Sequence, residues 1–150
     1  MNRIALGTLA ALATACAPTL RFNQTFLAPE DLKLAKNGYA SLKSTGESFD
    51  LSPIKAQEIG ASDRVVVLKV HGSYILVGDG FAKAFRLWPA GRDEAHYKAL
   101  DVQPGKQGFV SPTLEVSGKC ALIRWQRGGA PAQAFVTSEG DVDEKKCGDE

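Results

Sequence analysis

Three polar side chains in one short stretch have the residue types of a hydrolytic triad. His71, Ser73 and Asp79 lie close together in the chain, and a serine activated by a histidine and an acid is a common nucleophile. In α/β-hydrolases, however, the nucleophile occupies Gly-x-Ser-x-Gly between a strand and a helix. Here Gly72-Ser73 continues into an expected strand. We therefore interpret the group as a polar turn and predict no catalytic residue.

The remaining histidine and acidic residues lack the spacing of a metal site. His96 follows Asp93 and Glu94, but zinc sites usually have a second His or Cys nearby, and the only other histidine is 25 positions away. The segment 141–144 lacks the glycine and distal glutamate of an EF-hand loop and precedes two lysines. We predict no metal, and because the chain has no nucleotide-binding glycine motif, we predict no cofactor.

Two tryptophans accompany arginines and are candidates for a binding surface. Trp125 lies within 124–127, Arg-Trp-Gln-Arg, but in a strand it would share a face with Ala121 and Ile123. That placement predicts core packing. Trp88 lies at the expected end of a strand. A possible binding surface is therefore assigned to Arg86, Trp88 and Arg92.

The elements that must position these residues are mostly short strands. Apolar or alternating runs separated by glycine and proline turns are typical of a β-sandwich or barrel. Alternation in one run places Phe81, Lys83, Phe85 and Leu87 on a core face. The expected strands are 39–43, 64–70, 73–77, 81–88, 97–102, 108–110, 114–117, 120–126 and 132–137.

Two short helices are expected before the main strands. Pro29 begins the first, which would end at Gly38. Ser52 is the expected N-cap of the second, with Pro53 at its first helical position and Gly60 as its end. The predicted fold class is mainly β: a small antiparallel β-sandwich or barrel-like domain with one or two short helices near the N-terminus.

The first fifteen residues have the pattern of an export signal. Arg3 precedes an apolar run over 4–13, and small residues at 13–15 precede Cys16. The run has ten residues, whereas a membrane-spanning helix needs about 20. This order of basic start, short apolar run, small residues and cysteine resembles the signal peptide of bacterial lipoproteins, over residues 1–16 only.

The resemblance implies cleavage after Ala15 and a lipid on Cys16. Ala17, rather than Asp, follows the cysteine, which resembles lipoproteins of the outer membrane that face the periplasm. The alternative is an ordinary signal cut after Ala15 or Ala17, which gives a secreted or soluble periplasmic protein. The expected division is a signal peptide at 1–15, a lipidated N-terminus and tether at 16–28, and a single β-rich domain at 29–150.

Cysteine number and charge are compatible with export. With Cys16 acylated, Cys120 and Cys147 remain, and in an oxidising compartment they are expected to form a disulfide. Removing Arg3 from 18 basic residues leaves seventeen against 17 acidic ones. This balance gives no general attraction to nucleic acid.

These observations favour a non-catalytic envelope lipoprotein. The expected partners are the membrane, through the lipid, and another envelope protein or peptidoglycan. The alternative is a small inhibitor of a cell-wall hydrolase or protease, with the turn 117–119 or 128–131 contacting its target. The least favoured hypothesis is a hydrolase with a site around His71, Asp79 and His96.

Overall fold

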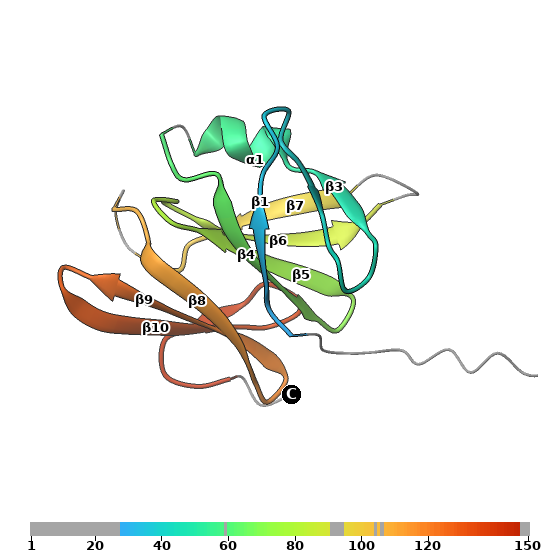
Figure 1. The fold of residues 1–150 in the computed structure, drawn as a ribbon. Coiled ribbons are helices and arrows are strands. Elements are labelled where there is room, and N and C mark those ends of the chain that lie inside the picture. The colour runs from blue at the N-terminus through green and yellow to red at the C-terminus, as the bar shows by residue number, and fades with distance from the viewer. Residues whose placement is uncertain (1–27, 59, 91–94, 104, 106, 148–150) are drawn as a thin grey trace, which may run out of the picture.

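The computed structural model describes residues 28–58, 60–90, 95–103, 105 and 107–147. The expected signal peptide, Cys16 and the tether up to residue 27 lie outside these residues. The described chain is mainly antiparallel β-structure (Figure 1). Its elements are β1 (Glu30–Lys33), β2 (Tyr39–Ser41), β3 (Ser48–Asp50), α1 (Ser52–Gln57), β4 (Arg64–Val70), β5 (Ser73–Gly78), β6 (Ala84–Pro89), β7 (Ala95–Leu100), β8 (Val110–Ser117), β9 (Cys120–Arg127), β10 (Ala130–Val136) and β11 (Val142–Asp143).

Two sheets contain most of these strands. The first has five strands in the order β1-β4-β5-β6-β7, and the second has four in the order β11-β10-β9-β8. A separate two-stranded ladder pairs β2 with β3. Neighbouring strands are antiparallel throughout these described sheets. Most pairs are consecutive in the chain, so short turns can set their register.

The turn between β9 and β10 illustrates this local control. Arg127 lies opposite Ala130, so Gly128 and Gly129 alone make the turn. Their φ angles are 58° and 80°, in the left-handed region that glycine adopts without steric cost. Successive positive φ angles match the right-handed twist of a hairpin. The glycine pair in the sequence is therefore sufficient to explain this turn.

The five-stranded sheet is covered on both faces. Every residue of β5 is buried, and because neighbouring residues of a strand point to opposite faces, both faces need cover. On one face Tyr74 packs edge-to-face against Phe49 of β3, with ring centroids 5.1 Å apart. On the other, β4 and β5 contact β8 of the second sheet. Figure 1 shows α1 and β3 on one side and β8, β9 and β10 on the other.

Hydrogen bonds also join the two sheets through their connecting segments. The Gly80 amide donates to the Phe109 carbonyl at 2.7 Å, and the Phe109 amide donates to the Phe81 carbonyl at 2.8 Å. The Ser111 amide donates to Asp79 Oδ1 at 2.8 Å. We call these contacts, between 79–81 and 109–111, the seam. They fix where β8 begins relative to β5 and β6.

The expected helix over 29–38 is wrong. This region contains β1 instead, and Leu32 lies opposite Val65 of β4. Leu32 and Leu34 are both buried, and apolar side chains two positions apart share one face of a strand. Pairing with β4 also satisfies backbone groups that a short helix would leave open. Proline and acids are compatible with a strand start, so the helix-start signal was not specific.

The second expected helix corresponds to α1, but its expected cap is wrong. The N-cap residue is Leu51, and no side chain caps the helix. Ser52 instead donates its amide to Asp50 Oδ1 at 2.9 Å. Hydrogen bonds from the Ser52 side chain and then its amide lower the pKa of Asp50. Asp50 therefore binds the amide of Ser52 at the start of the helix, and the Ser52 side chain is not the N-cap.

The main strands agree with the expected ranges apart from shifts at their ends. β10 begins at Ala130, two residues earlier than expected. β6 begins at Ala84 because the amides of Ala82 and Lys83 donate to the Glu58 carboxylate, at 2.7 and 3.2 Å. β7 begins earlier than expected, at Ala95. The segments expected at 108–110 and 114–117 belong to one strand, β8, with a register shift between Val110 and Thr113. The expected core positions Phe81, Phe85 and Leu87 are buried. The expected core position of Lys83 is wrong, because its side chain is 38 % exposed and forms an ion pair with Asp101.

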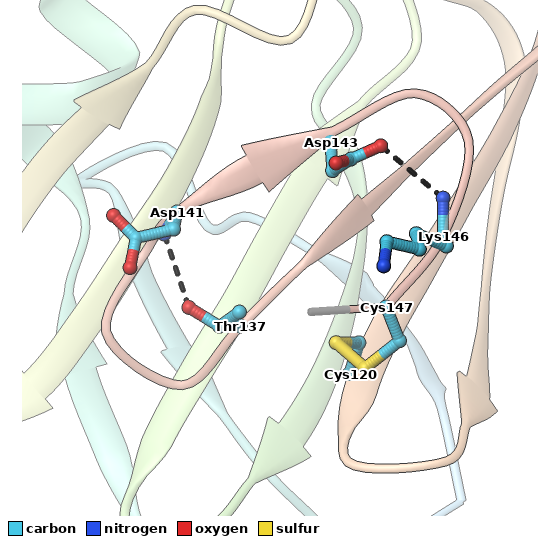
Figure 2. The surroundings of a disulfide bond; sticks show 6 residues. All are labelled: Cys120, Thr137, Asp141, Asp143, Lys146 and Cys147. Carbon is cyan, nitrogen blue, oxygen red and sulfur yellow. Dashed lines mark hydrogen bonds between the residues drawn. A yellow bond between two sulfur atoms is a disulfide. The ribbon is translucent and has the colours of Figure 1, made fainter. Parts of the chain in front are cut away.

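A disulfide joins the expected pair Cys120 and Cys147, with Cα atoms 5.8 Å apart. Figure 2 shows the bridge between the start of β9 and the segment after β11. Asp143 Oδ1 accepts the Lys145 and Lys146 amides at 2.7 and 3.2 Å. These backbone hydrogen bonds lower the pKa of Asp143. The C-terminal segment is therefore held to β9 by a covalent bond and shaped by a local carboxylate.

Replacing Gly108 by alanine should destabilise the fold. An added Cβ would lie 2.5 Å from the carbonyl oxygen of Gly80, so the seam would have to open. We expect Gly108→Ala to lower the free energy of unfolding by about 1–3 kcal/mol. Gly72→Ala is the matched control, because an added Cβ there has no neighbour within 4 Å. Urea denaturation compares them, and an equal effect of both changes would contradict the packing described.

Removing the disulfide should also destabilise the protein. The bridge closes a loop with a sequence separation of 27, and the chain-entropy model assigns such a loop about 3–4 kcal/mol. The double change Cys120→Ala and Cys147→Ala should lower the free energy of unfolding by that amount in urea denaturation. Cys16→Ser alone serves as the control. A double-variant loss below about 1 kcal/mol would contradict the expected contribution.

Candidate functional site

Trp88 lies in a small cluster of aromatic and basic residues on two neighbouring strands. In the β6–β7 register, Trp88 lies opposite His96 and Arg86 lies opposite Lys98. All four side chains therefore lie on the same face. The Arg86 Cζ is 4.6 Å from the Trp88 ring centroid, and the Trp88 and His96 ring centroids are 5.6 Å apart. We call these four residues the β6–β7 surface.

Hydrogen bonds and packing fix Arg86 in this cluster. Its Nε donates to Ser73 Oγ at 3.1 Å, and its Nη2 donates to Glu139 Oε2 at 3.3 Å. Gly140 lies close behind, since an added Cβ would be 3.2 Å from Arg86 Cδ. The arginine side chain is only 16 % exposed. Arg86 therefore packs against the Trp88 ring and fixes its orientation. Glu139 balances the charge of Arg86.

The outer part of the surface is accessible. Trp88 is half-buried, while His96 and Lys98 are exposed. Strand β7 is the last strand of its sheet, so its outer side borders no other strand of that sheet. The cluster thus has an ordered aromatic ring and two accessible nitrogen-bearing side chains at a sheet edge. Arg92, the third expected residue of this surface, lies outside the described residues.

Such a surface can make three kinds of contact. The tryptophan ring offers apolar area and an indole N–H, and Lys98 can meet an anionic group. The β7 backbone can accept an added strand. All three are contacts through which a surface can recognise a partner.

The structure does not bring the three triad-type residues together. His71 lies in the turn between β4 and β5, and Asp79 lies beyond the other end of β5, roughly 20 Å away for a strand of this length. Ser73 is buried and its hydroxyl accepts the hydrogen bond from Arg86. His96 belongs to β7 and contacts Trp88.

The acidic segment 141–144 makes local contacts. The Asp141 amide donates to Thr137 Oγ1 at 3.1 Å, and Asp143 binds the two lysine amides, as Figure 2 shows for Lys146. In the part of the chain that the structure describes, no three His, Cys, Asp or Glu residues cluster as metal ligands.

The second tryptophan belongs to the core, as expected. Trp125 is buried and packs edge-to-face against Phe109, with ring centroids 5.2 Å apart. Arg124 points away from it and forms an ion pair with Glu115. The two turns considered as target-binding loops, 117–119 and 128–131, lie at opposite ends of β9.

Sequence reasoning missed one polar cleft. Asp31 and Arg64 are joined by two hydrogen bonds, at 3.2 and 2.8 Å, and both line a cleft of about 440 Å³ with Asp79. Asp31 and Arg64 lie 33 positions apart, and the sequence placed Asp31 in a helix. Only the β1–β4 pairing brings them together, so no local signal could have indicated this cleft.

Comparison with protein-family models, with curated proteins and with solved structures found no match. No helix among the described residues is long and apolar enough to cross a membrane.

Truncating Arg86 should destabilise the protein more than truncating its neighbour. Arg86→Ala removes the stack on Trp88 and leaves the buried Ser73 hydroxyl without its donor, so we expect a loss of about 1–2 kcal/mol. Lys98→Ala is the matched control, because this exposed residue lies opposite Arg86, and it should change stability by less than about 0.5 kcal/mol. Thermal or urea unfolding measures the stability of both variants. A loss of stability in Arg86→Ala no larger than that in Lys98→Ala would contradict the structural role of Arg86.

Proposed function

We propose that this protein is a non-catalytic binding module of the bacterial envelope, anchored by a lipid on Cys16 and facing the periplasm. The single observation that carries the binding role is the ordered stack of Arg86, Trp88 and His96 at an accessible sheet edge. A half-buried tryptophan held by an arginine is a typical centre of an interface. The leader 1–16 supports the anchor.

The proposed anchor limits where the module can act. The 12 residues at 17–28 could span at most about 40 Å if fully extended. A lipidated module would therefore remain close to the membrane surface, which raises its effective concentration for neighbouring envelope components. The partner class we propose is another envelope protein or peptidoglycan. The outer membrane is the proposed location, with a secreted or soluble periplasmic protein as the alternative.

We also propose that the two sheets form a β-sandwich. Support comes from the contacts of β4 and β5 with β8 and from one buried cluster that includes Ile75 of the first sheet and Ile123 of the second. In this arrangement, the β6–β7 surface lies at an open margin of the first sheet. An envelope partner could then pair with β7 while a side chain contacts Trp88.

Inhibition of a cell-wall hydrolase or protease is the second proposal. It would use the turn 117–119 or 128–131 in place of the β6–β7 surface. These turns connect paired strands through Gly118-Lys119 and Gly128-Gly129, so each offers a small protruding tip. The larger aromatic surface is the reason to prefer the first proposal.

The anchor is tested by intact mass and membrane fractionation of the protein expressed in a bacterial host. We expect a mass increase that fits acylation, and membrane association that Cys16→Ser abolishes. A soluble, unacylated product cut near Ala15 would contradict the anchor and favour the secreted alternative.

The binding surface is tested by site-specific photocrosslinking in cells. A photoreactive residue at position 96 should give one discrete adduct with an envelope component, and adding Trp88→Ala should remove it. The same probe at Tyr39 is the control, because Tyr39 is exposed but belongs to the separate β2–β3 ladder. Equal adducts from both positions, or an adduct that persists without Trp88, would contradict the assignment. An adduct with a hydrolase from positions 118 or 128 would favour the inhibitor.

A further inference from the structure

Two clefts meet where β8 begins. The first, about 440 Å³, lies between the β1–β4 side of the five-stranded sheet and β8, and the second, about 470 Å³, lies over β9 and β10. Ser111 and Thr113 line both. Each volume falls in the range of about 300–1,000 Å³ typical of small-molecule sites. Because the clefts share two residues, an elongated ligand can occupy both, and we call them together the β8 groove.

The junction of the two clefts has an unusual backbone. Ser111 has a φ of 50°, in the left-handed region that non-glycine residues seldom adopt. It lies within the register shift of β8, between Val110 and Thr113. Its amide is held by Asp79. Strained residues of this kind often occur at binding sites, where surrounding contacts impose the conformation.

The floor of the first cleft is ordered by the seam. The Ser62 amide donates to the Asp79 carbonyl at 3.0 Å, while Asp79 Oδ1 accepts the Ser111 amide. Ser62 Oγ accepts the Arg64 amide at 3.0 Å. The polar groups of the cleft therefore occupy fixed positions before any ligand binds, which reduces the ordering that binding requires.

Charge in the first cleft is largely compensated between its own side chains. Arg64 lies against Asp31 through two hydrogen bonds, and Asp79 lines the same cleft. The hydrogen bond with Asp31, the charge of Asp31 and more weakly that of Asp79 raise the pKa of Arg64. An anionic ligand would meet two carboxylates, and a cationic one would meet the guanidinium. An apolar ligand would remove water from all three groups at a cost.

The remaining lining suits hydroxyl groups. Hydroxyls of Ser62, Ser111 and Thr113 can each donate and accept hydrogen bonds, beside the fixed acceptors and donors of the Asp31–Arg64 pair. The second cleft combines the amide side chains of Gln126 and Gln133 with apolar surface from Trp125, Pro131 and Ala132. Arg124 also lines it, and its charge is paired with Glu115. A saccharide ring has the same combination, with hydroxyls at its edge and C–H groups on its faces.

We propose that the β8 groove binds a neutral, hydroxyl-rich glycan, whose hydroxyls contact Asp31, Arg64 and Thr113 in the first cleft. The glycan continues across Ser111 into the second cleft, where Pro131 contacts a ring face and the side chains of Gln126 and Gln133, on the same face of the sheet, contact its hydroxyls. This site is separate from the β6–β7 surface and does not depend on its role.

The test is NMR titration of the ¹⁵N-labelled full chain carrying Cys16→Ser. The neutral probes are chitotriose, cellotriose and maltotriose, and the charged probes are trigalacturonate and triglucosamine. We expect at least one neutral trisaccharide to shift the amide signals of Ser62, Asp79, Ser111 and Thr113. The affinity of the charged probes should be lower by a factor of about ten or more. The proposal fails if no neutral probe shifts these signals at millimolar concentrations, or if a charged probe binds equally well.

Variants then assign the binding to the groove. Arg64→Gln and Thr113→Val should each weaken binding about tenfold. The Arg64–Asp31 pair is largely exposed, with side chains 68 % and 56 % accessible, so the fold should tolerate Arg64→Gln. Unchanged amide signals outside the groove would show directly that the Arg64→Gln variant keeps its fold. Asp31→Asn is a second test of the same ion pair. Tyr39→Ala, at an exposed residue of the separate β2–β3 ladder, is the matched control and should leave binding unchanged. Loss of binding in Trp88→Ala alone would move the glycan to the β6–β7 surface and overturn the proposal.

Discussion

Hydrogen bonds of the seam set the start of the second sheet against the first. The Gly80 amide donates to the Phe109 carbonyl and the Phe109 amide donates to the Phe81 carbonyl. Gly108 approaches Gly80 too closely to carry a side chain. Antiparallel hairpins fix each sheet internally, but they do not fix one sheet against the other. The seam supplies that relation, because it sets the start of β8 against the loop between β5 and β6.

Both candidate surfaces depend on this relation. The β8 groove exists only because β8 starts beside Arg64 and Asp79, and its strained Ser111 is held by the seam itself. The β6–β7 surface depends on the second sheet more indirectly. Glu139, in the turn between β10 and β11 of that sheet, accepts a hydrogen bond from Arg86. The disulfide at Cys147 lies shortly after that turn. The second sheet therefore supports the surface that the first sheet presents.

Local patterns predicted most of the strands, and long-range pairing explains the errors. Val-rich 64–70 and the Gly128-Gly129 turn have signals within a few residues, so their structures followed from the sequence. Strand β1 was mistaken for a helix because its stability comes from β4, more than thirty positions away. The sequence indicated Trp88 as a candidate for a binding surface. Its contacts with Arg86 and with His96 depend on the register of β6 and β7. The Asp31–Arg64 pair required the β1–β4 register.

Native-state hydrogen exchange of the Gly80 and Phe109 amides tests the central role of the seam most directly. Both amides donate across it. If the seam joins the sheets into one cooperative unit, these amides should exchange only through global unfolding, with the same opening free energy as the slowest amides of β5 and β9. Exchange at an opening free energy several kcal/mol lower would show that the sheets separate locally, and would contradict the account.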